Sequence, residues 1–136
     1  MSKAARSTAS SEAPALVLFA HGARDPQWAE PFHNIRRLLV ERRPGAVVEL
    51  AFLEIMQPSL ADAIARLAGA GHERIVVAPL FMAQGGHLKQ DVPRILEGIR
   101  AEHRGCNITL LPAIGEVGAI LDAIADWLWA NCLRQG

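Results

Sequence analysis

Cysteine, excess charge and long apolar runs are all scarce in this 136-residue sequence. Its two cysteines, Cys106 and Cys132, form no CxxC pair and do not suggest a disulfide scaffold, so we expect both thiols to be reduced. Fourteen basic residues balance fourteen acidic ones, which argues against the broad positive field that supports nonspecific nucleic-acid binding. The longest apolar runs, such as residues 13–20, fall far below the ~20 residues that span a bilayer, so we expect no membrane segment.

The beginning of the chain also lacks the apolar region, roughly 7–15 residues long, of a secretory signal. Residues 1–13 are instead small, polar and weakly basic, and we expect them to form a disordered leader. The remaining length suits one ordinary domain, and 51% hydrophobic with 21% charged residues is typical of a folded globular protein. We therefore expect a single domain over residues 14–136, located in the cytoplasm.

Short apolar runs alternate four times with longer segments of helical spacing, which indicates βαβ units. The first and third runs are almost unbroken in apolar character, as is typical of strands covered by helices on both faces. With right-handed connections, this pattern predicts an α/β fold, a three-layer sandwich around a four-stranded, mostly parallel sheet of flavodoxin-like order 2-1-3-4. The predicted strands are residues 15–20, 46–53, 74–82 and 107–111.

Each helical segment carries an apolar stripe that should face the sheet. Trp127 and Trp129 are two positions apart and cannot share a helical face, so we expect one in the core and the other at an interface. The second helix should stop near residues 69–71 because of their glycines. The stripes are Trp28, Phe32, Ile35 and Leu39; Leu60, Ile64 and Leu67; Ile95, Leu96 and Ile99 in a helix over 88–103; and Val117, Ile120, Leu121, Ile124 and Leu128 in a helix over 116–131.

Three potential metal ligands follow three of the predicted strands at equal spacing along the chain: His21, Glu54 and His87. In such sheets, ligands bind beyond the carboxyl ends of the strands, near the switch in strand order. Imidazole and carboxylate together suit borderline divalent ions such as Co²⁺, Ni²⁺, Fe²⁺ and Zn²⁺, and two or three protein ligands leave coordination positions open, as in a catalytic or transferring site. Gly22 and the glycines at 85–86 permit close approach of a ligand.

These residues also have purely structural interpretations. A histidine at a strand end can be a loop residue that hydrogen-bonds to backbone, and Glu54 can belong to a helix terminus or a salt bridge. His33, His72 and His103 have no partners at ligand spacing, so we expect exposed imidazoles at these three positions.

Three ordered motifs resemble the class II chelatases, in particular the short cobaltochelatases and ferrochelatases that act on sirohydrochlorin. The resemblance covers nearly everything from Leu16 to about Trp127, and its one clear departure is Ala23, where the family's first motif usually has serine. The motifs are His21-Gly22-Ala23-Arg24-Asp25-Pro26; Phe52-Leu53-Glu54 with Pro58-Ser59-Leu60; and Pro79-Leu80-Phe81 through Gly85-Gly86-His87 to Asp91-Val92-Pro93.

The resemblance implies that His21 and His87 are metal-binding and catalytic residues, and that Glu54 is a third ligand or relays a proton. It implies insertion of Co²⁺, or else Fe²⁺ or Ni²⁺, into sirohydrochlorin in cobalamin or siroheme biosynthesis. No nucleotide-binding loop is visible, so we expect no ATP requirement. Because the chain resembles one half of longer tandem chelatases, the resemblance also implies a homodimer with the cleft between subunits.

The tetrapyrrole that the resemblance implies carries many carboxylates. Three basic residues lie close in sequence to the two histidines and are candidates to bind these carboxylates: Arg24, Lys89 and Arg94. Each of the three can equally form an ordinary surface salt bridge. The apolar residues that can contact a flat macrocycle, or belong to the core, are Phe81, Met82 and Leu88.

Two rival functions use similar features. Histidine phosphatases also place a His-Gly pair after their first strand, but they require arginine immediately before the histidine, and here that residue is Ala20. A noncatalytic metal or tetrapyrrole carrier would use the same fold and ligands. An insertion assay distinguishes a carrier from a chelatase.

Overall fold

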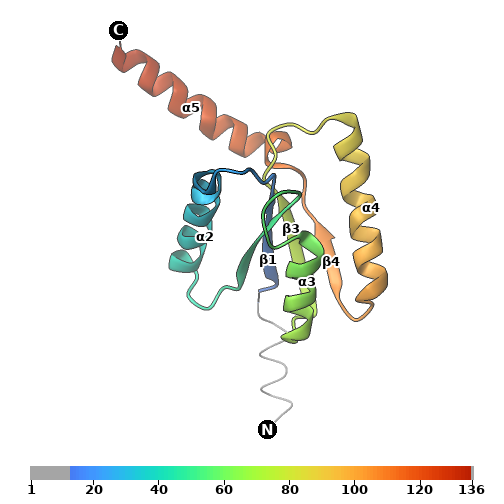
Figure 1. Ribbon diagram of the computed structural model, residues 1–136. Coiled ribbons are helices and arrows are strands. Elements are labelled where there is room, and N and C mark those ends of the chain that lie inside the picture. The colour runs from blue at the N-terminus through green and yellow to red at the C-terminus, as the bar shows by residue number, and fades with distance from the viewer. Residues whose placement is uncertain (1–12, 136) are drawn as a thin grey trace.

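The computed structural model describes residues 13–135, so the predicted leader lies almost wholly outside the described residues. Strands and helices alternate along the chain, with two short 3₁₀ helices, η1 and η2, inserted before longer helices (Figure 1). The elements are β1 (Ala15–Ala20), η1 (Pro26–Ala29), α2 (Glu30–Arg42), β2 (Val48–Phe52), α3 (Leu60–Gly69), β3 (Arg74–Pro79), α4 (Gly86–Glu102), β4 (Asn107–Leu110), η2 (Ile114–Glu116) and α5 (Gly118–Gln135).

The four strands form one parallel sheet in the order β2-β1-β3-β4, which confirms the predicted fold class and strand order. Their carboxyl ends therefore lie along a single edge of the sheet. The predicted third strand extended to residue 82, but β3 ends at Pro79, and the residues that follow form the loop leading to α4. These loop residues carry the third motif to the edge where ligands bind in such folds.

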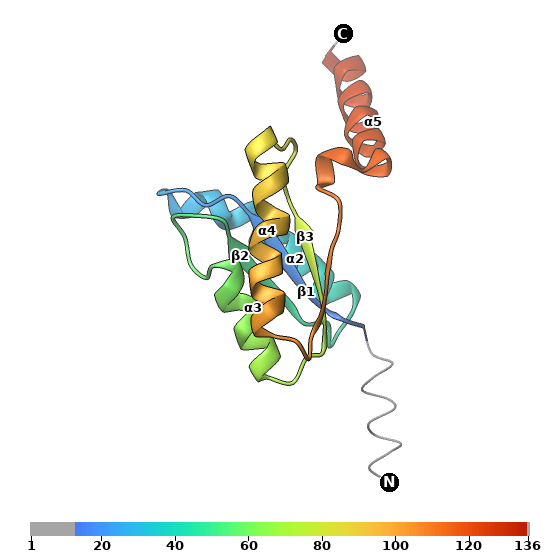
Figure 2. The same cartoon turned by 90° about the vertical axis from the view of Figure 1, so that its right-hand side faces the viewer.

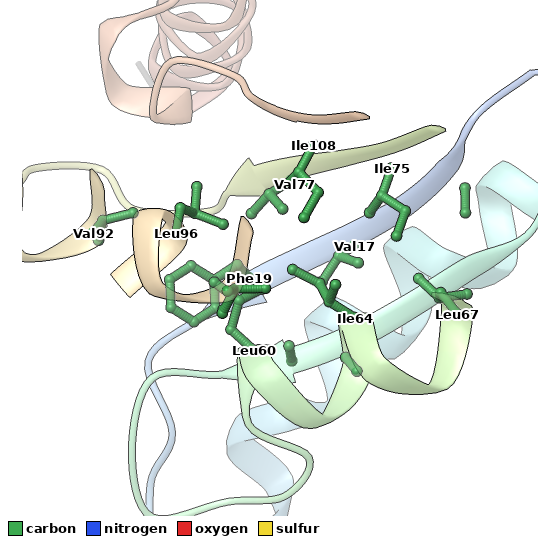
Figure 3. Packing of buried hydrophobic residues seen from close by; sticks show 14 of the residues in the cluster. Val17, Phe19, Leu60, Ile64, Leu67, Ile75, Val77, Val92, Leu96 and Ile108 are labelled. Carbon is green, nitrogen blue, oxygen red and sulfur yellow. The ribbon is translucent and has the colours of Figure 1, made fainter. Parts of the chain in front are cut away.

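Helices cover both faces of the sheet, as the sequence predicts. Val17 and Phe19 of β1 point into a large core under α3 and α4, whereas Leu18 and Ala20 point into a smaller cluster under α2. This alternation follows from the two-residue repeat of a strand. Figure 3 shows the larger core, with Ile64 of α3 and Leu96 of α4 packed among the strand residues.

Helix α3 follows its predicted limits closely. The Ser59 hydroxyl accepts a hydrogen bond from the Asp62 N–H at 3.1 Å and caps the first turn. The helix ends at Gly69, and Gly71 adopts a φ of +97°, a conformation that favours glycine. The predicted inward residues of α3 are all buried: Leu60, Ile64 and Leu67.

Two other predicted stripes are wrong in part. In α4, Leu96 and Ile99 are buried as predicted, but Ile95 is 38% exposed. In the first helical segment, Phe32 and Leu39 pack against the smaller cluster, whereas Trp28 and Ile35 are exposed. Trp28 belongs to η1, whose three residues per turn shift it out of phase with α2.

The predicted packing of the last helix is wrong. None of the residues of α5 is buried, and Figures 1 and 2 show this helix rising away from the sheet and from the other helices. The predicted core tryptophan is also wrong, because Trp127 and Trp129 are each 65% exposed. The predicted inward residues that are exposed are Leu121, Ile124 and Leu128. No helix in the described part of the chain, α5 included, is both long and apolar enough to cross a bilayer.

The larger core should dominate stability. We expect Leu96→Ala to lower the free energy of unfolding by about 2–5 kcal/mol, because it leaves a cavity at a fully buried position between α4 and the sheet. Leu38→Ala makes the same change on the 43% exposed side of α2 and should cost less than ~1 kcal/mol. Urea unfolding followed by circular dichroism measures both values, and equal losses would contradict the described core.

Candidate active site

A carboxylate connects the ends of β1 and β2. His21 follows β1 directly, and its Nδ1 lies 2.9 Å from Oε1 of Glu54, which follows β2. The other carboxylate oxygen, Oε2, accepts a hydrogen bond from the Gly22 backbone N–H at 2.8 Å. Glu54 therefore holds both the imidazole and the backbone of the first motif.

The backbone brings these two loops into direct contact. The Leu53 N–H donates to the Ala20 carbonyl at 2.8 Å, which continues the strand pairing beyond the sheet. A Cβ on residue 22 would overlap the backbone carbonyl of Glu54, so only glycine fits there. The sequence led us to expect close approach of a ligand at Gly22, but the group that approaches it in the structure is the Glu54 backbone of the second motif.

A tight turn directs the Glu54 carbonyl. Ile55 has a φ of +72°, and the Met56 N–H donates to the Glu54 carbonyl at 2.7 Å, which together form a classic γ-turn. A β-branched residue rarely adopts this conformation, which costs about 1–3 kcal/mol and is concentrated at functional sites. The Ile55 side chain is 65% exposed, so core packing does not account for the strained turn.

Two aromatic side chains position His21 from other parts of the chain. The Trp28 indole Nε1–H donates to the His21 backbone carbonyl at 2.7 Å. The Phe81 ring, buried in the core, lies with its centroid 4.8 Å from the imidazole centroid at a tilt of 49°. With Nδ1 directed at Glu54, the imidazole Nε2 has no hydrogen-bond partner within residues 13–135.

The environment of Glu54 favours its ionised form. Partial burial raises the pKa of this carboxyl, but the hydrogen bonds from Gly22 and His21 and the charge of His21 outweigh it, so the pKa lies below the ordinary value of 4.5. Glu54 is therefore a carboxylate at neutral pH, able to accept a hydrogen bond from His21 and to stabilise a positive charge on it.

His87 lies apart from this pair. It occupies the first turn of α4, where its side chain is exposed and makes no hydrogen bond or ion pair with any described residue. Over residues 13–135, no three His, Cys, Asp or Glu side chains gather in a way that could hold a metal ion. The structure thus brings His21 and Glu54 together, and the joint role of His21, Glu54 and His87 as ligands stays a prediction.

The three candidate substrate-binding cations are all exposed: Arg24 follows β1, Lys89 lies in the first turn of α4, and Arg94 lies in the middle of that helix. Arg24 has no ion-pair partner among the residues described. Lys89 lies 3.8 Å from Glu116, and Arg94 lies 3.7 Å from Asp91. These long, exposed pairs contribute little stability and leave the cations free to bind another anion.

The apolar candidates divide between core and surface. Phe81 is buried and Leu88 is half-buried against the larger core, so both have structural roles. Met82 is 55% exposed. Two hollows of about 470 and 360 Å³ lie beside Met56 and Lys89 respectively, and neither is lined by His21 or Glu54. The His21 site is thus an open edge.

A sequence model of the CbiX family matches residues 15–128 of this chain. The chain belongs to the CbiX family. The sirohydrochlorin cobaltochelatase of Saccharolobus solfataricus is 31% identical over 115 residues, which cover 78% of this chain and 88% of that protein. The sirohydrochlorin cobaltochelatase of Methanopyrus kandleri is 35% identical over 82 residues, but the match spans only 57% of its length. The chain likewise spans less than two thirds of some other curated relatives that it matches.

Solved structures of the same fold support this membership. A CbiX protein from Marinobacter aquaeolei, described as a putative cobalamin biosynthesis protein, has a TM-score of 0.77 and 35% identity, covering 91% of this chain and 98% of its own. The sirohydrochlorin chelatase SirB of Bacillus subtilis subspecies spizizenii, in complex with cobalt, has a TM-score of 0.68 at 21% identity. The match covers 88% of this chain and 51% of SirB, and at this identity it shows the fold alone.

Sequence reasoning missed two features of this CbiX-family site. The role of Trp28 depends on η1, whose start the sequence does mark, because Asp25 caps the Gln27 N–H and Pro26 follows at the first position. The strained turn at Ile55 leaves no comparable mark, since isoleucine is among the residues least expected at positive φ.

The close contact between Gly22 and the Glu54 backbone should be essential to the arrangement of this site. We expect Gly22→Ala to separate the first and second motifs and to lower the free energy of unfolding by about 1–3 kcal/mol, because the new Cβ overlaps Glu54 backbone. Gly98→Ala is the matched control: it meets open space inside α4 and should be neutral or stabilising by up to ~1 kcal/mol. Urea unfolding of both variants tests the contact, and indistinguishable losses would argue against it.

The charge on Glu54 should depend on His21. In His21→Ala, the pKa of the Glu54 carboxyl should rise, because one hydrogen bond and one nearby positive charge are lost while the Gly22 N–H bond stays. Carboxyl ¹³C NMR titration measures this change. His33→Ala, on the exposed surface of α2, should leave the pKa of Glu54 unchanged. An unaltered titration in His21→Ala would mean that the two side chains do not interact in solution.

Proposed function

We propose that this protein inserts a divalent metal into sirohydrochlorin, with Co²⁺ as the first candidate and Fe²⁺ or Ni²⁺ as alternatives, in cobalamin or siroheme biosynthesis. The observation that carries the proposal is an imidazole held on one side by a carboxylate, with its second nitrogen open at the edge of the sheet. The cobaltochelatase names of the relatives and the cobalt complex of SirB supply the substrate class.

His21 has the chemistry that metal transfer requires. Neutral imidazole with Nδ1–H donating to Glu54 Oε1 leaves the lone pair of Nε2 available for a metal ion or for a proton. A carboxylate behind a ligating histidine fixes its tautomer and raises its basicity, an arrangement common at metal sites. A site with only two or three protein ligands lets the ion leave again, as insertion demands.

Glu54 supports this step from behind the imidazole. Insertion displaces two pyrrole protons, and a proton taken up at Nε2 of His21 would create an imidazolium next to an ionised carboxylate. Because both carboxylate oxygens already accept hydrogen bonds, we infer that Glu54 orients His21 and balances its charge, with direct metal ligation as the alternative.

His87 and the basic residues complete the proposed site. His87 is the second proposed ligand and proton acceptor, and its freedom from other hydrogen bonds within residues 13–135 is consistent with that role. Arg24, Lys89 and Arg94 would bind carboxylates of the macrocycle. The amino terminus of α4, which opens beside His87, also favours anions.

We also propose that the protein acts as a homodimer without nucleotide and in the cytoplasm. An open edge with His21 and Glu54 contacts a flat macrocycle on one side only, so a second surface is needed to exclude water and to distort the ring. A second copy of the chain supplies that surface most simply, since this chain aligns with 51% of the length of SirB, as one half of a tandem chelatase would.

Anaerobic insertion, followed by absorbance, tests the proposal. Purified protein should accelerate insertion of Co²⁺ into sirohydrochlorin without nucleotide, and parallel reactions with Ni²⁺ and Fe²⁺ rank the metals. Folded protein that binds metal or tetrapyrrole but leaves the rate at the protein-free value is a carrier, and the chelatase proposal is then wrong.

Variants separate the roles of the three residues. His21→Ala and His87→Ala should each lower turnover by about 10²-fold or more, because each loses a ligand and a proton acceptor. Glu54→Gln should lower it about 10- to 100-fold, since the amide still accepts a hydrogen bond but carries no charge. His103→Ala, at the opposite end of α4 from His87, is the matched control and should retain parent activity. Parent-like turnover in His21→Ala or His87→Ala would overturn the site assignment.

A further inference from the structure

A hollow beside α4, called the α4 hollow below, lies apart from the His21–Glu54 pair. Its volume is about 360 Å³, and its lining comes from the end of β3, the loop after it, the start of α4, the residues after β4, and η2. Part of this lining is apolar and buried, notably Pro79, Val92 and Ala113. The polar side chains of the lining are Gln84, Lys89 and Glu116.

A loose ion pair occupies the lysine of the α4 hollow. Nζ of Lys89 lies 3.8 Å from Oε1 of Glu116, and the two side chains are 63% and 46% exposed. An exposed pair of this length adds little stability, so another anion can displace Glu116. The half-buried Gln84 side chain makes no hydrogen bond with any residue in 13–135, so its amide is available as a second donor.

The backbone fixes the position of Glu116. The Gly115 N–H donates to the Phe81 carbonyl at 3.1 Å, and a Cβ on Gly115 would overlap the Met82 carbonyl, so η2 lies tightly against the loop after β3. The ring of Phe81 is also the one that contacts the His21 imidazole. Glu116 is therefore attached to the loop that carries the third motif and supports the candidate active site.

The α4 hollow lies at the rim of the proposed macrocycle site and not at its centre. His87 and Lys89 are two positions apart in α4, so their side chains point to different sides of the helix. Lys89 shares its side with Val92 and Pro93, which also line the hollow, whereas His87 does not line it. A tetrapyrrole carries its carboxylates on side chains around the rim of a flat ring. A ring centred at the two histidines would therefore present such a side chain to the hollow.

The size and lining of the hollow suit one carboxylate side chain. Pockets that hold a whole small ligand measure roughly 300–1,000 Å³, so a hollow of about 360 Å³ fits an arm of a tetrapyrrole better than its ring. The methylene groups of the arm would contact Pro79 and Val92, and its carboxylate would bind Lys89 and Gln84. Glu116 alone opposes this ligand, because it places a like charge beside the incoming anion.

We propose that Glu116 is a competing anion that holds Lys89 until a carboxylate side chain of the tetrapyrrole displaces it and enters the α4 hollow. The identity of this ligand rests on the proposed function. Glu116 is tethered beside Lys89, so its effective concentration there is roughly millimolar and dilute free anions do not displace it. A carboxylate on a ring already held at His21 is tethered as well and competes on equal terms. Glu116 thus makes the subsite selective for a carboxylate that arrives on the macrocycle.

Binding of metal-free sirohydrochlorin to the full chain tests the displacement, followed anaerobically by fluorescence at constant ionic strength. Glu116→Gln should lower the Kd about 2- to 5-fold, because the carboxylate of the ring no longer has to break an ion pair. Lys89→Gln should raise the Kd about 3- to 10-fold, since a charge-assisted hydrogen bond is lost. In the Lys89→Gln background, Glu116→Gln should leave the Kd unchanged, because no lysine remains to be released.

Glu41→Gln is the matched control for net charge. Glu41 forms an exposed ion pair with Arg37 on α2, and the separation is again 3.8 Å. Removing it should leave the Kd for sirohydrochlorin at the parent value. Equal tightening in Glu41→Gln, or tightening by Glu116→Gln that persists without Lys89, would reveal a general effect of charge on a polyanion and overturn the displacement. Parent-like affinity in Lys89→Gln would remove the subsite.

Free acetate distinguishes a carboxylate on the ring from one in solution. When acetate replaces chloride at the same ionic strength, it should weaken sirohydrochlorin binding more in Glu116→Gln than in the parent, because Lys89 is then unguarded. Equal weakening in both proteins would contradict the guarding role of Glu116.

The proposed function is judged separately from the subsite. A parent that binds sirohydrochlorin but inserts no metal would refute the chelatase proposal and leave the subsite to the binding measurements. A parent that inserts metal while Lys89→Gln binds sirohydrochlorin equally well would refute the subsite alone. A parent that binds no sirohydrochlorin would refute both.

Discussion

The carboxylate of Glu54 joins two loops that the chain brings to one edge of the sheet, and the arrangement of the site depends on that link. Its two oxygens accept hydrogen bonds from the His21 imidazole and from the Gly22 backbone, so side-chain orientation and loop position are set together. The link requires the bare backbone of Gly22 and the strained turn at Ile55. Backbone strain at one residue is thus offset by two charge-assisted hydrogen bonds at its neighbour.

The sequence was sufficient to predict the sheet and its order. Buried parallel strands appear as unbroken apolar runs, and β1 matches its predicted limits because both of its faces are covered. The position of His21 and Glu54 follows from the same logic, since residues after parallel strands meet at one edge. The hydrogen bond between them was not predictable, because its formation depends on the turn at Ile55, a conformation that isoleucine seldom adopts.

Helix packing was predicted less well, for a related reason. A periodic stripe shows that a helix has an apolar side, but it does not identify the surface which that side contacts. The stripe of α3 faces its own sheet, and the prediction holds. The similar stripe of α5 faces no part of the described chain, and the residues expected in the core, such as Leu128, are exposed.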